Sequence, residues 1–395
     1  MASERTYPPP ITGLRQILAV CRMLARYYHV RLVQPGDKCG KNIENSIEII
    51  TFKRAADRHP MLTEKKWLKA LACFLDPAPL ISVLHASRRA SLLMAYCITF
   101  FPQCLLVAKL MRKPLVLLLG DVFSIIYWRA RALGYMTMPR LFLYALLALE
   151  KLAVLMADKV VVVSYADGEV VGSWGARDKL IVIPLSLDEE DLRKKLSRTC
   201  REKAYERLKG LKALGNKIVM FHGNMKYPPN RLAALFIAEE VAPRVWASEP
   251  HVVFALVGPH PPDELARDDA RVAVPGPVGN IYKYIELADV GIAPIFFGSG
   301  VKNKVLEYMA LSKPVVATRI AVEGLRVKDG VHFLLASGAD EFAKHVVELL
   351  RNKKLASEIG ENARNYVMAY HSLKNYEAYK EVIEELLGDD REACG

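Results

Sequence analysis

Cysteines are few in this sequence, and none of them stands in a pattern that builds a site. Seven cysteines among 395 residues form no Cys-x-x-Cys pair and no cluster with histidine. A zinc ribbon or a disulfide scaffold is therefore not expected, and a reducing compartment is the default. The N-terminal sequence MASERTYPPP also lacks the apolar core of a signal peptide. We expect a cytoplasmic protein and leave open a peripheral association with the cytoplasmic face of a membrane.

Acidic residues are scarce in the first half of the chain. Residues 1–200 hold 29 Lys and Arg against 17 Asp and Glu, whereas residues 201–395 hold 26 of each. The whole formal excess of +12 therefore lies in the first half. Such an excess favours phosphate-bearing ligands, nucleic acid or an anionic membrane surface as partners. Because the second half is neutral, the two halves are expected to face different partners.

Long apolar runs are also rare, and only one reaches the length of a membrane span. Ala90 to Ala108 has 19 residues without a charge, but Pro102 and Gln103 interrupt it and basic residues follow closely. A helix, a break, a short helix and a buried strand at 114–119 fit this pattern better than a span. Docking of the region on a membrane surface stays an open alternative.

Short β-branched and aliphatic runs alternate with helical patterns along the chain. Continuous apolar strands separated by helices are typical of parallel sheets that are covered on both faces. The predicted strands are residues 30–33, 47–52, 81–84, 115–119, 160–163, 180–183, 218–221, 252–257, 272–274, 290–292, 315–317 and 332–335. They predict an α/β fold with two doubly wound, Rossmann-like domains that face a cleft.

A charged stretch divides these strands into two sets of six. We expect an N-terminal domain over 1–185, a solvated helix and linker over 186–215, a C-terminal domain over 216–370, and a helix and tail over 371–395. Ligands bind outside the carboxyl ends of parallel strands, so functional residues are expected directly after strands.

One such segment follows the predicted strand at 290–292 and reads GSGVKNKVLEYMA. Gly298 and Gly300 allow the backbone to approach a ligand closely. Together with Ser299, Val301 and the first N–H groups of the following helix, they predict a cradle for an anion. A surface loop of ordinary composition is the alternative interpretation.

Three charged side chains continue this segment. Lys302 and Lys304 add positive charge suited to a diphosphate. Glu307 follows about one helical turn later, where its carboxylate can accept two vicinal hydroxyl groups such as those of a ribose.

A second segment, FHGNMKYPPN, follows the predicted strand at 218–221. Gly223 and Asn224 occupy the strand-to-helix turn, where a phosphate group can bind. Lys226 is either a phosphate ligand or a solvated charge. Asn230 is expected to cap the next helix, because asparagine is favoured at that position.

These motifs and their order resemble the retaining glycosyltransferases of family 4, which are group 1 glycosyl transferases with the two-domain GT-B fold. The similarity covers residues 217–370 through FHGNMKYPPN, LVGPH, VPGPVGNIYKYIELADVGIAPI, GSGVKNKVLEYMALSKPVVAT and AVEGLRVKDGVHFLLA. The first half is similar more loosely, through YPPPITGLRQI, LEKLAVLMADKVVVVS and LIVIPLSLD.

The resemblance implies a function for several of these residues. The second domain would bind a nucleotide-sugar donor, with Glu307 on the ribose and Gly258 of LVGPH among the donor-binding positions. Lys304 and Lys302 would neutralise the diphosphate leaving group. Gly13 and its neighbours would close over that diphosphate from the first domain.

The sequence departs from the family pattern in four places. Ser299 stands where the family often has the first of two glutamates, and Asn224 stands where an arginine is common. Gly120 replaces a frequent histidine, so Asp121 is our candidate polar group near the reacting centre, with a helix N-cap as its alternative role. The family also has a strand before the first glycine loop, and MASERT is too polar to form it.

The expected activity is hexosyl transfer with retention to a glycan or a lipid-linked acceptor, with an anionic membrane surface as a possible partner. Neither a cofactor nor a metal is expected, because the sequence has no Asp-x-Asp motif and lysines can take the place of Mg²⁺. Nucleic acid is not an expected partner, since no aromatic-rich basic motif is present. A nucleotide-sugar epimerase of the same fold and a catalytically silent nucleotide-sugar-binding protein remain the alternatives.

Overall fold

The computed structural model describes residues 14–35, 39–44, 46–52, 77–135, 139–265, 269 and 271–392. Internal contacts divide the chain into two compact units, each described by itself below. Unit 1 comprises residues 1–124, 138–185 and 374–395, and unit 2 comprises residues 125–137 and 186–373. The chain therefore passes to unit 2 and returns to unit 1 at its C-terminal end. The predicted donor-binding residue Gly13 lies outside the described residues.

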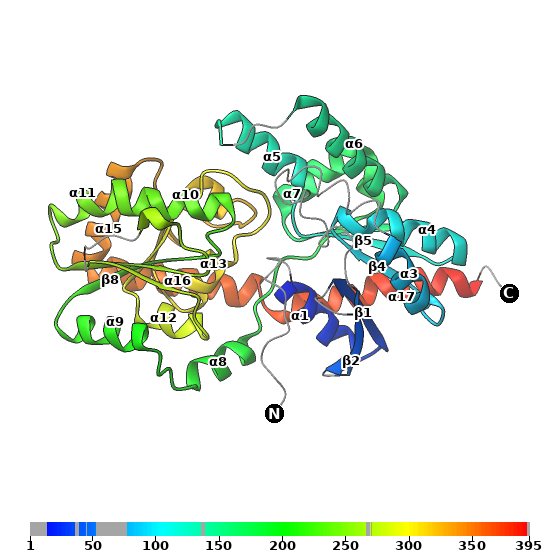
Figure 1. Ribbon diagram of the computed structural model, residues 1–395, viewed down its shortest axis with the longest axis horizontal. Coiled ribbons are helices and arrows are strands. Elements are labelled where there is room, and N and C mark those ends of the chain that lie inside the picture. Colours follow the sequence, from blue (N-terminus) through cyan, green and yellow to red (C-terminus); the bar gives the residue numbers. More distant parts are fainter. Residues whose placement is uncertain are drawn as a thin grey trace. The chain divides into compact units, whose positions relative to one another are not determined.

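Unit 2 contains a six-stranded parallel sheet that has β8 near its centre (Figure 1). The strand order is β10 (Val272–Gly276), β9 (Val252–Val257), β8 (Lys217–His222), β11 (Val290–Ala293), β12 (Val315–Ala317) and β13 (Leu334–Leu335). The four middle strands are apolar and almost wholly buried. Such strands need helices on both faces of the sheet, and this confirms the pattern that the apolar runs predicted.

Helices cover both faces of this sheet. The helices of unit 2 are α8 (Glu189–Ser197), α9 (Lys203–Ala213), α10 (Pro228–Phe236), α11 (Ala242–Trp246), α12 (Ile281–Leu287), α13 (Asn303–Ala310), α14 (Arg319–Val322), α15 (Ala339–Arg351) and α16 (Lys353–Tyr370). In Figure 1, α10 and α11 lie above the sheet, and α9 and α12 lie below it. The stretch expected as a helix and linker thus contains two helices, the first capped by the Asp188 side chain, which accepts from the Asp191 N–H.

Unit 1 contains two separate sheets. One is parallel, in the order β4 (Leu93–Tyr96), β5 (Leu115–Leu119), β6 (Lys159–Val162) and β7 (Leu180–Val182). The other is the three-stranded sheet β1 (Val30–Pro35), β3 (Ile47–Phe52) and β2 (Gly40–Glu44), in which β2 is antiparallel to β3. Both units are α/β structures, as predicted.

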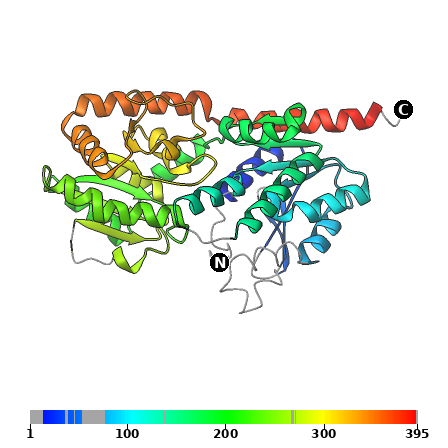
Figure 2. The same cartoon turned by 90° about the horizontal axis from the view of Figure 1, so that it is seen from above.

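The helices of unit 1 form two layers. They are α1 (Leu14–Leu24), α3 (Pro77–Ser87), α4 (Phe101–Met111), α5 (Phe123–Ala132, most of which clusters with unit 2), α6 (Arg140–Met156), α7 (Tyr165–Val171) and α17 (Ala378–Glu392). Helix α4 contacts α3 and α6, whereas α17 contacts α1. In Figure 2, α17 (red) lies on the other side of the strands from α3 and α4 (cyan). In the described part of the chain, no helix is long and apolar enough to cross a membrane.

A mainly apolar cavity of about 710 Å³ separates the two sheets of unit 1. Strand β1 is the edge of one sheet and β4 is the edge of the other, and both strands line this cavity along their lengths. Helices α1 and α17 contribute Leu24 and Ile383 on one side, and α3 contributes Val83. Among the described strands, β1 pairs with β3 alone and β4 pairs with β5 alone.

Two of the element predictions in the first half are wrong. Residues 81–84, predicted as a strand, lie in α3, and residues 93–96, predicted as helix, form β4. Strand β2 was not predicted, because GKNIE is polar and exposed. The two wrong predictions concern apolar runs of four residues, and periodicity does not distinguish helix from strand over such a length. The strand that was missed is a polar edge strand, which has no apolar pattern.

Candidate functional site

The first part of the site lies where β8 and β9 end. The two strands pair in register from Lys217 and Val252 to His222 and Val257, so Gly223 and Gly258 follow at the same edge of the sheet. The Gly223 N–H donates to the Val257 carbonyl at 3.0 Å. Gly258 has a φ of +145°, and a Cβ atom there would overlap the Gly223 carbonyl. Only glycine fits at position 258, and the two loops therefore pack backbone to backbone.

The second part is the loop between β11 and α13. Gly298 and Gly300 have φ values of +145° and +66°, so the conformation of this loop requires glycine at both positions. The Lys302 ammonium donates to the carbonyl oxygens of Ser299, at 3.0 Å, and Gly300, at 2.9 Å. This lysine thus holds the loop in shape, while the buried Ser299 and the partly buried Val301 lie just before the N-terminus of α13.

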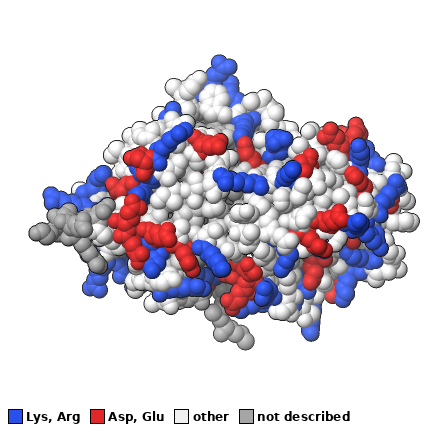
Figure 3. Space-filling model, turned by 180° about the vertical axis from the view of Figure 1, so that it is seen from behind, with Lys and Arg blue, Asp and Glu red and all other residues white. Residues whose placement is uncertain are grey.

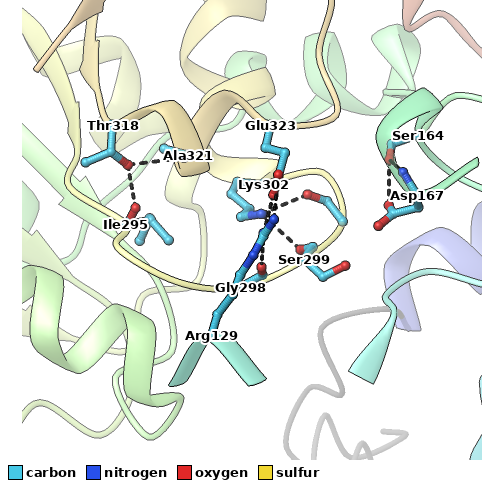
Figure 4. A network of polar contacts seen from close by, with 11 residues as sticks. Arg129, Ser164, Asp167, Ile295, Gly298, Ser299, Lys302, Thr318, Ala321 and Glu323 are labelled. Atoms are coloured by element: carbon cyan, nitrogen blue, oxygen red, sulfur yellow. Dashed lines mark hydrogen bonds and ion pairs between the residues drawn. The ribbon is translucent and has the colours of Figure 1, made fainter. Parts of the chain in front are cut away.

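Arg129 anchors the same loop from α5. Its guanidinium donates to the Gly298 carbonyl at 2.8 Å and makes a two-pronged contact with the Glu323 carboxylate, with 2.7 Å between Nη2 and Oε1 (Figure 4). The Tyr135 ring stacks on Phe297, with 5.2 Å between ring centroids. Planar, two-pronged arginine contacts fix orientation as well as position. The glycine loop is therefore held from two sides.

A second anchor supports the start of this loop. The Thr318 hydroxyl, which follows β12, donates to the Ile295 carbonyl and accepts from the Ala321 N–H at 3.2 Å (Figure 4). The hydroxyl thereby caps α14 and ties it to the segment that leaves β11.

Lys304 is a buried cation at the centre of the site. Its ammonium donates to the Asn230 Oδ1 atom at 2.5 Å and lies 4.3 Å from the centroid of the Phe221 ring. Burial lowers the pKa of Lys304 from its ordinary value of 10.5 to about 7; the Glu307 charge opposes this shift, and the smaller effect of the Lys302 charge adds to it. A lysine in this state takes a proton readily when an anion arrives.

Asn230 orients this lysine and does not cap the helix, so the capping prediction is wrong. Helix α10 begins at Pro228 with Tyr227 at the N-cap, which places Asn230 inside the first turn. The Asn230 Nδ2 atom donates to the Asn224 carbonyl at 2.9 Å. A proline at the first helical position fixes the start of the helix ahead of Asn230.

Glu307 is buried on the same helix, one turn after Lys304. Its Oε2 atom lies 2.7 Å from the His222 Nε2 atom, and its Oε1 atom accepts from the Tyr282 hydroxyl at 3.3 Å. The other ring nitrogen of His222 lies 2.9 Å from the Tyr308 hydroxyl, which also donates to the Met220 carbonyl at 3.0 Å. Burial and the Glu307 charge raise the pKa of Tyr308 well above 10.0, so it remains a neutral hydroxyl. Glu307 is thus a fixed carboxylate.

The other predicted donor-binding residues lie around this centre. The Asn224 Oδ1 atom accepts from the Lys226 N–H at 3.0 Å, which closes the turn after β8, and the Lys226 side chain is exposed. Gly13 is outside the described residues, so its assignment stays a prediction. Within the described part of the chain, no group of three or more His, Cys, Asp or Glu could hold a metal ion.

Asp121 lies in unit 1, after β5, and its catalytic role also stays a prediction. Its alternative role as a helix N-cap stays a prediction as well, and the structure shows another carboxylate at the start of α5. The N–H groups of Phe123 and Ser124 donate to the two carboxylate oxygens of Glu150, at 2.7 and 3.1 Å. At Gly120, a Cβ atom would overlap the Tyr96 hydroxyl, so glycine at this position makes room for that side chain.

Sequence reasoning missed several residues that shape the site. His222 and Tyr282 contact Glu307, and Arg129 and Glu323 hold the loop. His222 could have been found, because it is the polar last residue of the apolar strand IVMFH and precedes Gly223. Arg129 could not, because it is about 170 residues away from the loop in the sequence.

Comparison with known proteins shows which family the second half of the chain is similar to. Residues 216–352 match the family described as glycosyl transferases group 1. An uncharacterized 44.6 kDa protein in the cps region of Klebsiella pneumoniae is 26% identical over 179 residues, which is 42% of this chain and 44% of that protein. An uncharacterized glycosyltransferase of Methanocaldococcus jannaschii is 35% identical over 83 residues, 20% of this chain and 24% of that protein. The chain thus spans less than half the length of these curated relatives.

Solved structures show the same fold over nearly the whole chain. Sucrose-phosphate synthase from Thermosynechococcus elongatus superposes with a TM-score of 0.72 at 16% identity and covers 96% of this chain and 94% of its own. The Anabaena protein HepE, solved in complex with UDP and glucose, has a TM-score of 0.67 at 16% identity, over 93% of this chain and 95% of its own. At this level of identity the likeness concerns the fold.

Proposed function

We propose that this chain, whose residues 216–352 belong to the glycosyl transferases group 1 and whose fold is GT-B, is a retaining glycosyltransferase. It transfers a hexosyl group from a nucleotide-sugar donor to a glycan or lipid-linked acceptor in the cytoplasm, at a membrane surface and without a metal. The observation that carries the proposal is the pair of buried side chains Lys304 and Glu307, one helical turn apart behind a braced glycine loop.

The two side chains fit opposite parts of a nucleoside diphosphate. The N-terminus of α13 and the Lys304 ammonium present positive charge where a diphosphate would bind. Glu307 presents a carboxylate that His222 and Tyr282 hold in one orientation, which suits the two vicinal hydroxyls of a ribose. HepE, which shares the fold, was solved with UDP and glucose, and this supports a donor of the same chemical class.

The reaction places its largest charge change on the leaving group. The bond between the anomeric carbon and the diphosphate oxygen breaks, and a bond from the acceptor oxygen forms on the same face of the sugar. The acceptor proton passes to the departing diphosphate. Lys304 gains its own proton as the anion approaches, because its pKa lies near 7 in the free protein. The N–H groups at the start of α13 and the Lys304 ammonium would stabilise the negative charge on the departing diphosphate, as a metal ion does in other enzymes.

Thermal unfolding with a panel of nucleotide sugars tests the donor class. A donor that binds only the folded protein stabilises it by about 2.7 kcal/mol at a concentration of 100 times its Kd. UDP should stabilise the protein more than 2′-deoxy-UDP if Glu307 accepts the ribose hydroxyls, and Glu307→Gln should remove most of this difference. Equal shifts with both nucleotides would contradict the assignment of Glu307.

Substitution of Lys304 tests the diphosphate part. Lys304→Met is expected to weaken binding of UDP by roughly 10- to 100-fold, because a hydrogen bond to a charged group contributes about 1.5–3 kcal/mol. Lys313→Met is the control, since the Lys313 ammonium is also a hydrogen-bond donor, to the carbonyls of Glu286 and Ala288, but precedes β12, at the opposite edge of the sheet. Donor binding without transfer to any acceptor would instead favour a silent binding protein.

A further inference from the structure

Helix α6 of unit 1 exposes an apolar face. Six large apolar side chains on it have exposed fractions between 39% and 81%: Leu141, Tyr144, Leu149, Leu152, Leu155 and Met156. Successive members are three to five residues apart, except for the adjacent Leu155 and Met156, and at about 3.6 residues per turn all six fall in one stripe on one side of the helix. The opposite face packs into unit 1 through Leu143, Leu146 and Val154, and the helix is about 25 Å long at 1.5 Å per residue.

The neighbouring helices extend this stripe into a surface. Helix α4, which contacts α3 and α6, exposes Leu106 and Leu110, and α3 exposes Ile81 and Leu84. Single exposed apolar residues are ordinary, but ten large ones on three helices that contact in series mark an interaction surface. We call this set, with the six residues of α6, the α3–α4–α6 surface.

Basic residues border this surface, and acidic residues are nearly absent from it. The exposed basic residues are Arg88, Arg89, Lys109, Arg112, Arg140 and Lys151. Residues 77–124 and 138–157 contain only two acidic residues, Asp121 and Glu150, and Glu150 is buried. The face shown in Figure 3 differs, because acidic and basic side chains are mixed across it. Part of the excess of basic residues in the first half of the chain therefore lies on the helices that carry this apolar surface.

We infer that the α3–α4–α6 surface binds an anionic lipid bilayer, with α6 lying in the plane of the headgroups. Large apolar side chains in a stripe with bordering lysine and arginine are the composition of helices that bind membrane interfaces without crossing them. The basic residues attract the phosphates of anionic lipids, and the leucines enter the boundary of the acyl chains. The inference rests on the proposed function, in which a lipid-linked acceptor places the enzyme at a membrane.

The charge of the surface favours a bilayer over a second copy of the chain. In a symmetric dimer through this face, each basic border would meet a border of the same sign, and like charges in contact repel. The negative charge of an anionic bilayer instead complements the positive charge of all these basic residues.

Flotation with lipid vesicles tests the inference on the full chain. The wild type is expected to float with vesicles of phosphatidylglycerol and phosphatidylcholine at low salt, and much less with phosphatidylcholine alone. The triple variant Leu141→Gln, Leu152→Gln, Leu155→Gln should lose at least 10-fold in the bound fraction, because it removes exposed leucines from the stripe. Leu214→Gln is the matched control, since Leu214 in unit 2 is as exposed as Leu141, at 81%, and should bind as the wild type does.

Two outcomes would overturn the inference. One is flotation of the triple variant at the wild-type level, and the other is a wild-type dimer in solution that the triple variant converts to a monomer. Thermal unfolding should show that the triple variant keeps its fold and its stabilisation by UDP. This readout separates the two proposals. If UDP did not stabilise the wild type, that result would count against the proposed donor site and not against the membrane surface.

Discussion

Lys304 is the side chain whose protonation a ligand is expected to change most. A fully buried ammonium with an uncharged partner, Asn230, loses hydration without an opposing charge in direct contact, and this is why its pKa falls to about 7. Above pH 7 the folded protein holds fewer protons at this site than the unfolded chain, whose lysines titrate near pH 10.4. An arriving diphosphate favours the charged form and reverses the shift.

This proton makes binding depend on pH in a defined direction. At pH 8 we expect uptake of close to one proton for each UDP bound, and weaker binding as the pH rises from 7 to 9, approaching about tenfold for each pH unit. Calorimetry in buffers of different ionisation enthalpy measures the uptake. Lys304→Met should remove it, and an enthalpy that is the same in all buffers would contradict the expected titration.

At the scale of helices, Glu150 joins α6 to the start of α5. One buried carboxylate accepts from two consecutive N–H groups that the helix itself leaves without partners. Burial raises the pKa of Glu150, so keeping the carboxylate charged has a cost that these bonds offset. The carboxylate fixes α5, whose Arg129 in turn holds the glycine loop.

Removal of this carboxylate should destabilise the protein. Glu150→Leu leaves the N–H groups of Phe123 and Ser124 without acceptors, and we expect a loss of about 2–4 kcal/mol in the free energy of unfolding. Glu150→Gln keeps one acceptor and should lose less. Urea unfolding measures both, and a leucine variant as stable as the wild type would show that the cap contributes nothing.

Arg129 offers a second test at this scale. Arg129→Ala removes the bonds to Gly298 and Glu323, so the glycine loop loses its preferred position. We expect UDP to bind roughly 10-fold more weakly, because the loop would then lose conformational entropy when UDP binds. Arg131→Ala, a change of the same kind two residues away on α5, is the control. Unchanged affinity in Arg129→Ala would mean that the loop keeps its shape without this contact.

For the whole molecule, the sequence predicted unit 2 far better than unit 1. Strands such as VVFALV are apolar throughout and are bounded by glycine or charged residues, so their period, length and ends are clear. The glycines at 258, 298 and 300 were also identifiable, and their positive φ angles require glycine, whereas at Gly223 a Cβ atom would meet the Asn230 side chain. The partners of Glu307 and of the loop were less accessible, since His222 and Arg129 meet them only through the tertiary fold.

The described strands of unit 1 form two sheets, and we call the cavity-lined boundary between β1 and β4 the seam. The cavity between β1 and β4 means that no ladder of hydrogen bonds joins the three-stranded sheet to the four-stranded one among the described strands. Among the described residues, helices and side-chain packing around an apolar space link the two sheets, and packing next to a cavity is weak.

We expect the parts of unit 1 on either side of the seam to open separately. We expect the amides of β1 and β3 to exchange with deuterium at least 10-fold faster than those of β5 and β6, because α1 and the smaller sheet can detach without disturbing the larger one. Hydrogen exchange followed by mass spectrometry measures this, and equal protection on both sides of the seam would show a single cooperative unit. The edge of β4 would then stand open, so this seam is also where unit 1 is most exposed to pairing with a foreign strand.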